Sequence, residues 1–341
     1  MKAIRIREPG GAEVLELVDV EAPVASAGEA LVRVRAAGLN RADLLQRAGH
    51  YPAPPGVPAD IPGLEFAGEL VDFGPEAGRV GETAARAAFG PGAAVMGIVG
   101  GGAYAEYLTV PVEHLMQAPA SLSITEAGGI PEVFLTASDA LFSRGKLVAG
   151  DRVLIHSAGG GVGSAALQLA AAAGASGVCG TASGPKLGLL RARDLRLDLG
   201  VDYTRDDFAD AVREWTGGAG VDVILDTVGA PYWQQNVSSL ASLGRLVIVG
   251  VMGGSTVEVD LRALMARRAS VIGTVLRARS IDEKAAVTRL FAERFLRLFD
   301  ETPAGLRPII DRTVPLSDAA EAHRYMESNR SFGKIVLEVE G

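Results

Sequence analysis

The feature that most constrains the fold is a short apolar segment that runs directly into a cluster of glycines. Residues 153–164 read VLIHSAGGGVGS, and an alanine-rich stretch follows. A strand, a glycine turn and a helix occur in this order where a dinucleotide-binding unit begins. The G-x-G-x-x-G fingerprint maps to Ala158, Gly160 and Gly163, with alanine at its first position. We therefore predict a loop, including Gly161 and Val162, and a helix whose N-terminal N–H groups face a pyrophosphate. The alternative is a glycine-rich turn that binds no cofactor.

Apolar strands and helices alternate after this loop. The predicted strands are 152–156, 177–180, 201–203, 221–225, 245–249 and 271–275. The predicted helices are 164–173, 186–198, 208–216 and 232–243. Short apolar strands separated by helices are typical of a parallel, doubly wound α/β sheet.

Both ends of the chain have a different pattern. Period-two alternation predicts strands at 3–7, 13–18, 30–36, 65–73, within 95–110, and at 334–339. Helices are predicted at 42–47, 124–142, 282–299 and 317–327, the last with a serine N-cap. Residues 51–62 contain five prolines and are predicted to form a long ordered loop. We expect the two ends to form one β-rich domain, into which the α/β unit is inserted.

The composition excludes several classes of protein. The 33 Lys and Arg against 41 Asp and Glu give a net charge of −8, so no nucleic-acid partner is expected. The single cysteine, Cys179, excludes an internal disulfide and a four-cysteine zinc site, and its apolar strand favours a core role over a nucleophilic one. No apolar signal segment begins the sequence, and glycines interrupt the uncharged stretch between Arg152 and Lys186. We therefore expect a cytoplasmic protein without a membrane span.

The end of the second α/β strand bears on the choice of dinucleotide. NAD-binding folds place an acid there to hold the ribose 2′-hydroxyl, but residues 179–186 read CGTASGPK. Ser183 and Lys186 could instead bind a 2′-phosphate, which favours NADPH. Lys186 could also be a solvated lysine at a helix start. Tyr203, after the third strand, could line the adenosine pocket or lie on the surface.

Motifs along nearly the whole chain resemble one family. They are GLNRADLLQR at 38–47, YPAPPG at 51–56, GLE at 63–65, GGAYAEY at 101–107, IPEVFLTA at 130–137, YW at 232–233, MGG at 252–254 and GKIVL at 333–337. On these motifs the chain resembles the zinc-independent medium-chain dehydrogenases/reductases of the quinone oxidoreductase group, especially their p53-inducible type. The resemblance implies an α/β fold with a GroES-like β-rich catalytic domain, 1–124 and 278–341, and an inserted Rossmann domain, 125–277. Residues 80–92 and the helix at 186–198 are longer than the family pattern.

The resemblance also implies a site without a metal. Zinc-dependent relatives carry a cysteine at about the position of Asn40. The four histidines are scattered along the sequence, at His50, His114, His156 and His323. No Cys/His constellation is therefore expected to bind zinc.

The implied chemistry is hydride transfer from NADPH to a quinone. Asn40 and Thr136 would border the nicotinamide, and Tyr51 would face the substrate and hydrogen-bond the quinone oxygen. The remaining predicted cofactor-binding residues come from glycine-bearing or terminal loops of the α/β sheet: Gly250, Met252 and Leu276. Tyr51 could instead only pack its loop, and Asn40 could only form a local turn. Asp43 is expected to cap or orient the helix at 42–47.

Other functions stay open at this level. The same scaffold could reduce an α,β-unsaturated aldehyde or ketone, because a fold does not determine a substrate. The chain could also be an NADPH-binding sensor or interaction protein with negligible turnover, of which an RNA-binding form is disfavoured by the acidic charge. In relatives the Rossmann sheet edge pairs across a dimer, so the resemblance implies a homodimer.

Overall fold

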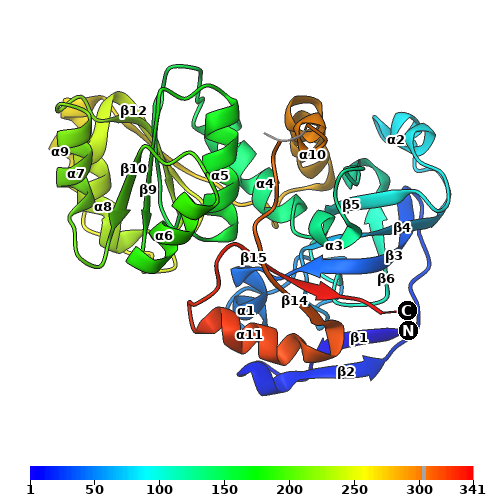
Figure 1. Cartoon of the computed structure of the whole chain (residues 1–341). Helices are drawn as coiled ribbons and strands as arrows, with labels where there is room; N and C mark the ends of the chain where they lie inside the picture. The colour runs from blue at the N-terminus through cyan, green and yellow to red at the C-terminus, as the bar shows by residue number, and fades with distance from the viewer. Residues whose placement is uncertain (302–304, 341) are drawn as a thin grey trace. The chain divides into compact units, whose positions relative to one another are not determined.

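The computed structural model describes residues 1–301 and 305–340. Its backbone divides into two compact units, the first comprising residues 1–135 and 276–341 and the second residues 136–275. Figure 1 shows that the blue N-terminal strands and the red C-terminal strand belong to the same unit. The domain limits expected at 124/125 and 277/278, between a GroES-like catalytic domain and a Rossmann domain, remain a proposal.

The first unit is built on a mainly antiparallel sheet. Its strands are β1 (Lys2–Ile6), β2 (Leu15–Asp19), β3 (Glu29–Gly38), β4 (Glu65–Phe73), β5 (Ala94–Ile98), β6 (Tyr107–Pro111), β7 (Leu115–Gln117), β14 (Ile310–Pro315) and β15 (Lys334–Glu338). Within the described residues, the main sheet has the order β14-β15-β3-β4-β5-β7, β6 also pairs with β3, and β1 pairs with β2. Buried positions alternate along most of β3, as its sequence predicts.

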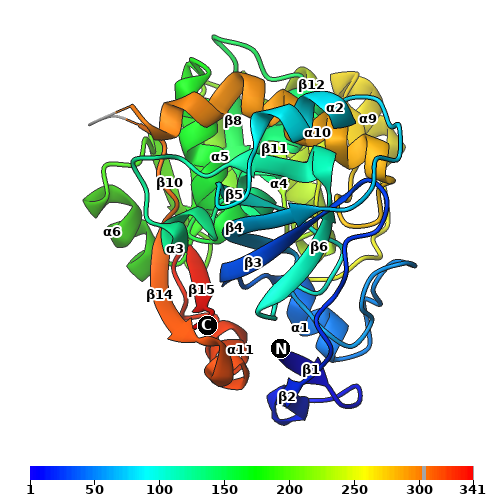
Figure 2. The same ribbon diagram turned by 90° about the vertical axis from the view of Figure 1, so that its right-hand side faces the viewer.

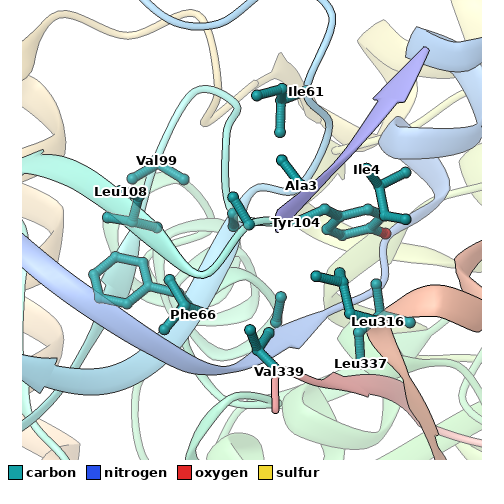
Figure 3. Packing of buried hydrophobic residues seen from close by; sticks show 14 of the residues in the cluster. Ala3, Ile4, Ile61, Phe66, Val99, Tyr104, Leu108, Leu316, Leu337 and Val339 are labelled. Atoms are coloured by element: carbon teal, nitrogen blue, oxygen red, sulfur yellow. The ribbon is translucent and has the colours of Figure 1, made fainter. Parts of the chain in front are cut away.

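Residues from both ends of the chain complete the core of this unit. Ala3 and Ile4 pack in one cluster with Phe66, Tyr104 and Leu337, all of them at most 1% exposed (Figure 3). Burying a large apolar side chain contributes about 1.5–3 kcal/mol. We therefore expect the unit to need both terminal segments for its stability.

The helices of the first unit include one that the sequence analysis did not predict, at Glu82–Ala88, and the others differ from the predictions in their bounds or continuity. They are α1 (Arg41–Arg47), α2 (Glu82–Ala88), α3 (Ile124–Ala127), α10 (Ile281–Phe295) and α11 (Ala319–Glu327), while α4 (Pro131–Ser138) crosses from this unit into the next. Figure 2 shows α10 and α11 in orange and red. The helix predicted at 124–142 is interrupted at Gly128 and Gly129, and its last part is a π-helical turn, Asp139–Arg144. The predicted serine N-cap of α11 is wrong, because a 3₁₀ turn at Leu316–Asp318 precedes the helix.

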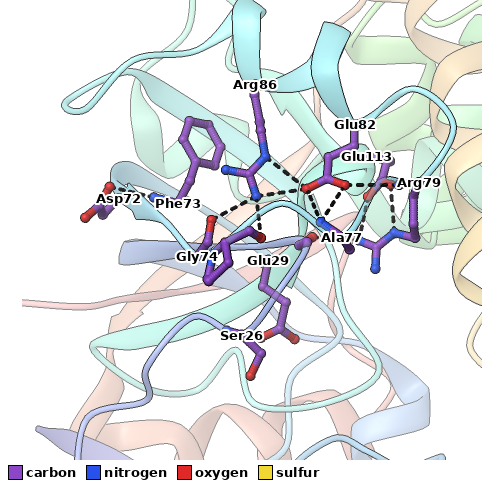
Figure 4. Close-up of polar contacts among 12 residues, drawn as sticks. Ser26, Glu29, Asp72, Phe73, Gly74, Ala77, Arg79, Glu82, Arg86 and Glu113 are labelled. Carbon is purple, nitrogen blue, oxygen red and sulfur yellow. Dashed lines mark hydrogen bonds and ion pairs between the residues drawn. The ribbon is translucent and has the colours of Figure 1, made fainter.

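The segment around α2 is organised by one buried carboxylate. Glu82, 2% exposed, accepts hydrogen bonds from the backbone N–H groups of Ala77 and Arg79 and pairs with Arg86 at 2.9 Å (Figure 4). Arg79 also binds Glu113 through two contacts of 2.8 Å. These charge-assisted contacts hold a loop that carries few apolar side chains.

The second unit is the predicted parallel sheet. Its strands are β8 (Arg152–Ile155), β9 (Gly177–Ala182), β10 (Leu199–Asp202), β11 (Val221–Asp226), β12 (Leu240–Ile248) and β13 (Ser270–Gly273). All neighbours pair in parallel in the order β10-β9-β8-β11-β12-β13, which is the doubly wound order of a Rossmann sheet. The helices are α5 (Gly161–Ala172), α6 (Gly184–Ala192), α7 (Phe208–Trp215), α8 (Trp233–Ser239) and α9 (Leu261–Arg267).

Two helices of this unit are shorter than predicted. The helix predicted at 186–198 ends at Ala192, before Asp194 adopts a φ of +52°. The helix predicted at 232–243 ends at Ser239, because β12 already begins at Leu240 beside β11. Among the described residues, no helix has the length and apolar character needed to cross a bilayer.

Candidate active site

The candidate site residues form two groups, one in each unit. In the first unit, β3 ends at Gly38 and α1 begins at Arg41, which places Asn40 at the N-cap. The backbone N–H of Asn40 donates to Oδ2 of Asp43 at 2.8 Å. Asp43 thus orients the start of α1, in line with its predicted role.

The Asn40 amide is locked by hydrogen bonds. Its Nδ2 donates to Gly38 O at 3.2 Å and to Glu65 Oε1 at 2.9 Å, while its Oδ1 accepts from Lys334 Nζ at 2.9 Å. The nitrogen of the amide therefore faces a carboxylate and its oxygen faces an ammonium, which determines the orientation of the amide. Asn40 does more than form the local turn that the sequence left open.

Glu65 and Lys334 form a buried ion pair beside this amide. Lys334 Nζ lies 2.6 Å from Glu65 Oε1, and the side chains are 3% and 0% exposed. Lys334 also donates to Leu39 O, and Glu65 Oε2 accepts from the backbone N–H of Glu132. A Cβ on Gly38 would lie 2.3 Å from Glu65 Oε1, so only glycine lets β3 approach this carboxylate.

A buried carboxyl and a buried phenol extend the network. The Tyr104 hydroxyl donates to Asp43 Oδ2 at 3.0 Å. Burial raises the pKa of Asp43 to about 6, although the Asn40 N–H, the Tyr104 hydroxyl and the Lys334 charge oppose the rise. Burial and the negative charge of Asp43 raise the pKa of Tyr104 well above its usual value, so this phenol stays neutral.

Tyr51, the predicted substrate-facing residue, begins the proline-rich loop and is half-buried. Arg277 donates to the Tyr51 carbonyl at 3.0 Å, and its guanidinium lies 5.0 Å from the centre of the Tyr51 ring. Burial raises the pKa of Tyr51, an effect that the charge of Arg277 opposes and that of Glu132 reinforces. The phenol therefore remains a hydrogen-bond donor at neutral pH.

Glu132 is a titratable group that the sequence did not single out as a site residue. Burial and the negative charge of Glu65 raise its pKa to about 8, although Lys334 and Lys284 favour the charged form. The carboxyl is therefore largely protonated at neutral pH. An acid within the apolar motif IPEVF was the available signal.

In the second unit, the glycine loop has the predicted strand–loop–helix form. β8 ends at Ile155, Ser157 adopts a φ of +53°, and Gly160 is the N-cap of α5. A Cβ on Gly163 would lie 2.2 Å from Ser157 O, so glycine is required where the helix packs on the loop. Ala158 is buried at the base of this loop. An anionic group fits the N-terminus of α5, which carries no acidic residue in its first turn.

The structure also brings Lys186 to the glycine loop. A Cβ on Gly159 would lie 3.0 Å from both Cβ and Cδ of Lys186, so the lysine stem lies across the loop. Ser183 is the N-cap of α6, and its side chain makes no capping hydrogen bond. These positions suit the two residues for a phosphate near the first turn of α6.

Sequence reasoning missed an acid at the same helix end. Asp202, the last residue of β10, has Oδ2 2.7 Å from the position of a Cβ on Gly184. Hydrogen bonds from Thr204, together with one from the Gly184 N–H, lower the pKa of Asp202. A carboxylate thus lies close to Ser183, although no acid ends β9 itself.

The other predicted cofactor-binding residues lie at separate points. Tyr203 and Met252 are 50% and 55% exposed, Gly250 follows β12, and Thr136 lies in α4. Leu276 is 7% exposed and belongs to the first unit. The binding role of each stays a prediction.

A chain of buried hydrogen bonds, which the sequence analysis did not predict, begins at His156, directly after β8. His156 contacts Thr181 Oγ1 at 2.9 Å through Nδ1 and Asn236 Oδ1 at 2.6 Å through Nε2. Asn236 donates in turn to Asp226 Oδ2 at 3.0 Å. Burial lowers the pKa of His156, so this ring is a neutral connector between the ends of the strands.

The single cysteine is buried, and the described residues contain no cluster of side chains that could hold a metal ion. Cys179 is fully buried, and burial raises the pKa of its thiol, which fits the core role predicted for it. Within residues 1–301 and 305–340, no group of three or more His, Cys, Asp or Glu side chains could hold a metal ion.

Known proteins share this combination of units. Residues 26–120 match the alcohol dehydrogenase GroES-like domain, and residues 195–337 match the zinc-binding dehydrogenase family. Quinone oxidoreductase from Homo sapiens is 31% identical over 343 residues, which cover 99% of this chain and 97% of the human protein. The chain belongs to the quinone oxidoreductase family of medium-chain dehydrogenases/reductases.

Solved structures with other names are also similar to this quinone oxidoreductase family member. An NAD-dependent alcohol dehydrogenase is 32% identical with a TM-score of 0.82 and covers 100% of both chains. The enoyl reductase JamJ is 27% identical with a TM-score of 0.84 and covers 99% of both chains. The predicted fold class, a GroES-like unit with a Rossmann sheet, is confirmed. The family membership makes the chain an oxidoreductase with a nicotinamide cofactor and a small-molecule substrate.

Proposed function

We propose that this chain transfers a hydride from NADPH to a quinone without a metal ion. The observation that carries the proposal is the half-buried Tyr51 phenol, whose backbone is fixed by Arg277. Its hydroxyl makes no hydrogen bond to any residue that the structure describes, so it is available to a ligand. An available neutral donor is what a carbonyl oxygen needs as it gains negative charge.

The residues of the chain orient and stabilise, while bound reduced nicotinamide supplies the hydride. Asn40, with its amide locked by Glu65 and Lys334, and Thr136 border the nicotinamide in this proposal. The Tyr51 O–H donates to the quinone oxygen that becomes an oxyanion after hydride addition to the ring system. One proton from solvent neutralises this oxyanion. Loss of the proton on the hydride-bearing ring carbon, with protonation of the second carbonyl oxygen, then gives the hydroquinone, so that one hydride and one proton are consumed in all.

Two groups support NADPH over NADH, and one opposes it. The loop Ala158–Gly163 would hold the pyrophosphate, and Ser183 and Lys186 would hold the 2′-phosphate. Asp202 brings a negative charge to the same helix end, which weakens the preference. Tyr203, Gly250, Met252 and Leu276 complete the proposed cofactor-binding set.

A zinc-free site is supported by what surrounds Asn40. The side-chain Oδ1 of Asn40 and Oε1 of Glu65 both accept from the Lys334 ammonium, at 2.9 and 2.6 Å. A divalent cation would need the same oxygens and would be repelled by the ammonium. Metal analysis of the purified protein, with activity assayed before and after chelation, tests this part of the proposal.

The first experiment compares NADPH and NADH as donors. Purified protein is mixed with 1,2-naphthoquinone, and loss of the reduced-nicotinamide absorption band is followed by stopped flow. Turnover with a strong preference for NADPH is the expected result. Binding of NADPH without oxidation across a panel of ortho- and para-quinones would overturn the quinone proposal.

The enoyl reductase likeness favours a second candidate, the reduction of an α,β-unsaturated carbonyl compound. The Tyr51 phenol would then stabilise the enolate oxygen rather than a quinone-derived oxyanion. Profiling of enones and quinones at equal NADPH concentrations separates the two functions. A kcat/KM that is higher for enones would replace the first proposal with the second.

We also propose a homodimer in the cytoplasm. The sheet edge β13 and its surroundings expose apolar side chains, among them Val271, Val275, Leu261 and Met265, which are 39–74% exposed. An open edge flanked by apolar residues supports pairing with a second copy. Light scattering after gel filtration should give twice the chain mass of 35.3 kDa.

A further inference from the structure

Arg277 is a buried cation that binds two backbone carbonyls and one side-chain oxygen, from three separate segments of the first unit. It is 4% exposed. Its Nε donates to Gly100 O at 2.8 Å, its Nη1 to Tyr51 O at 3.0 Å and its Nη2 to Gln46 Oε1 at 2.5 Å. All three acceptors are uncharged oxygens, so the guanidinium acts here through the directions of its N–H groups.

These contacts hold the proline-rich loop at both of its ends. Arg277 binds the carbonyl of Tyr51, where the loop begins. Gln46, held by Arg277 through its Oε1, donates through Nε2 to Ala59 O at 3.0 Å, near the end of the loop. One arginine and one glutamine thus bridge α1 to both ends of the segment that carries the phenol.

A neighbouring glycine segment packs against the middle of the same loop. A Cβ on Gly100 would lie 3.0 Å from Pro54 Cγ and 3.2 Å from Val57 Cγ1. Because Arg277 also binds Gly100 O, the guanidinium links this glycine segment to the loop that it supports. One guanidinium can bind all three segments at once, because its N–H groups point in fixed, different directions.

The guanidinium also acts on the Tyr51 side chain. It lies 5.0 Å from the ring centre, within the range of a cation–π contact. The titratable groups that face Arg277 are the carboxyls of Asp43 and Glu132, the latter largely protonated at neutral pH, and the ammonium of Lys284. A fixed cation here favours an oxygen that gains negative charge beside the phenol.

We infer that Arg277 is a positioning residue that, together with Gln46, holds Tyr51 in the orientation required by a carbonyl acceptor. This inference rests on the proposed function, because Tyr51 is the group through which Arg277 acts. Misplacement of a catalytic donor by about 1 Å costs on the order of 100-fold in rate. Lysine keeps the charge but cannot donate in three fixed directions.

The test combines Arg277→Lys with Tyr51→Phe and both substitutions together. Relative to the unmodified protein, Arg277→Lys is expected to lower kcat for the quinone about 10–100-fold. The KM for NADPH should stay within about twofold, because Arg277 acts at the acceptor. In the Tyr51→Phe background, the same substitution should cost less than about threefold, because the phenol that it positions is already gone. Equal losses in both backgrounds, or a loss confined to cofactor binding, would overturn the inference.

A matched control and a second variant keep the test decisive. Arg289→Lys on α10, where the side chain is 65% exposed, should leave the kinetics unchanged. Gln46→Met keeps Arg277 but removes both the hydrogen bond to Ala59 O and the Oε1 that Arg277 binds. It should also lower kcat, and it provides the test of the inference if Arg277→Lys fails to fold. A kcat of Gln46→Met equal to that of the unmodified protein would contradict the inference that Arg277 and Gln46 together position Tyr51.

Hydrogen–deuterium exchange separates failure of this inference from failure of the proposed function. Peptides covering residues 48–66 should exchange faster in Arg277→Lys and Gln46→Met than in the unmodified protein and Arg289→Lys. If the unmodified protein reduces no quinone or enone, the proposed function fails. Independently of that result, unchanged exchange of residues 48–66 in Arg277→Lys and Gln46→Met would show that the two residues do not hold the loop.

Discussion

The ammonium of Lys334 lies 2.6 Å from Oε1 of Glu65 although the two residues are 269 positions apart in the chain, and both side chains are buried. This ion pair joins the last strand, β15, to the first residue of β4. The Asn40 amide is held between the two charges, so the pair that stabilises the sheet also orients a candidate site residue.

Removing either charge of this pair should destabilise the protein strongly. Lys334→Met leaves a buried carboxylate without its cation, and such changes cost about 3–5 kcal/mol. Urea unfolding measures the free energy. Lys2→Met, which breaks the exposed pair with Asp19, is the control and should cost less than about 1 kcal/mol. Similar losses for both variants would contradict the structural role of the Glu65–Lys334 pair.

Tyr51→Phe should lower kcat for quinone reduction by about 100–1,000-fold, the loss measured when one oxyanion donor is removed elsewhere. The KM for NADPH should hardly change, because the phenol faces the acceptor. Steady-state kinetics with saturating NADPH provides the measurement, and Tyr107→Phe in β6 serves as the matched control. A kcat within about threefold of the original would mean that Tyr51 only packs its loop.

The sequence was sufficient for much of the fold because the strands are short and their burial is regular. β4 has the predicted bounds, Glu65–Phe73, and the strand–glycine–helix order located β8 and α5. Helix ends were harder to predict. The helix predicted at 232–243 ends at Ser239 because pairing with β11 outweighs the local helical pattern beyond that point.

The candidate site was only partly predictable, because its contacts connect distant segments. Asn40 and Tyr51 could be named from local motifs. Their partners, Lys334 and Arg277, lie more than two hundred residues away in contacts that no local pattern encodes. The available signal was a charged residue within an apolar stretch, as in GKIVL and TVLR.

Glu132 should make stability depend on pH. Its pKa is raised from 4.5 to about 8, so this group contributes stability that is complete below about pH 4.5 and lost as the pH rises through about 8. Asp43 acts in the same direction between its usual value of 3.8 and about 6. Glu132→Gln should therefore flatten the fall in unfolding free energy between about pH 6 and 8.5, by roughly 1–3 kcal/mol after allowing for partial exposure.

Urea unfolding of both proteins at several pH values provides the measurement. Asp43 is present in both proteins, so the difference between the two curves isolates Glu132. Parallel curves from about pH 6 to 8.5 would show that Glu132 titrates near its ordinary value.

Lys186→Met should reduce the use of NADPH but not that of NADH. Methionine keeps the stem that packs across Gly159 and removes only the ammonium. A hydrogen bond to a charged group is worth about 1.5–3 kcal/mol, so kcat/KM for NADPH should fall about 10–100-fold. Arg213→Met, at a side chain 68% exposed on α7, is the control. Equal losses with both cofactors would remove Lys186 from the proposed phosphate site.

Asp202→Asn should change cofactor preference in the opposite direction. The amide keeps an oxygen that can accept from Thr204, but it removes the negative charge near Gly184 and Ser183. Because a carboxylate at this helix end would repel a phosphate dianion bound beside it, the ratio of kcat/KM for NADPH to that for NADH should rise a few-fold. The rise should be larger at low ionic strength, since salt screens an exposed charge. If the ratio falls instead, Asp202 orients Ser183 or Gly184 for the cofactor. Its hydrogen bonds would then affect cofactor preference more than its negative charge does.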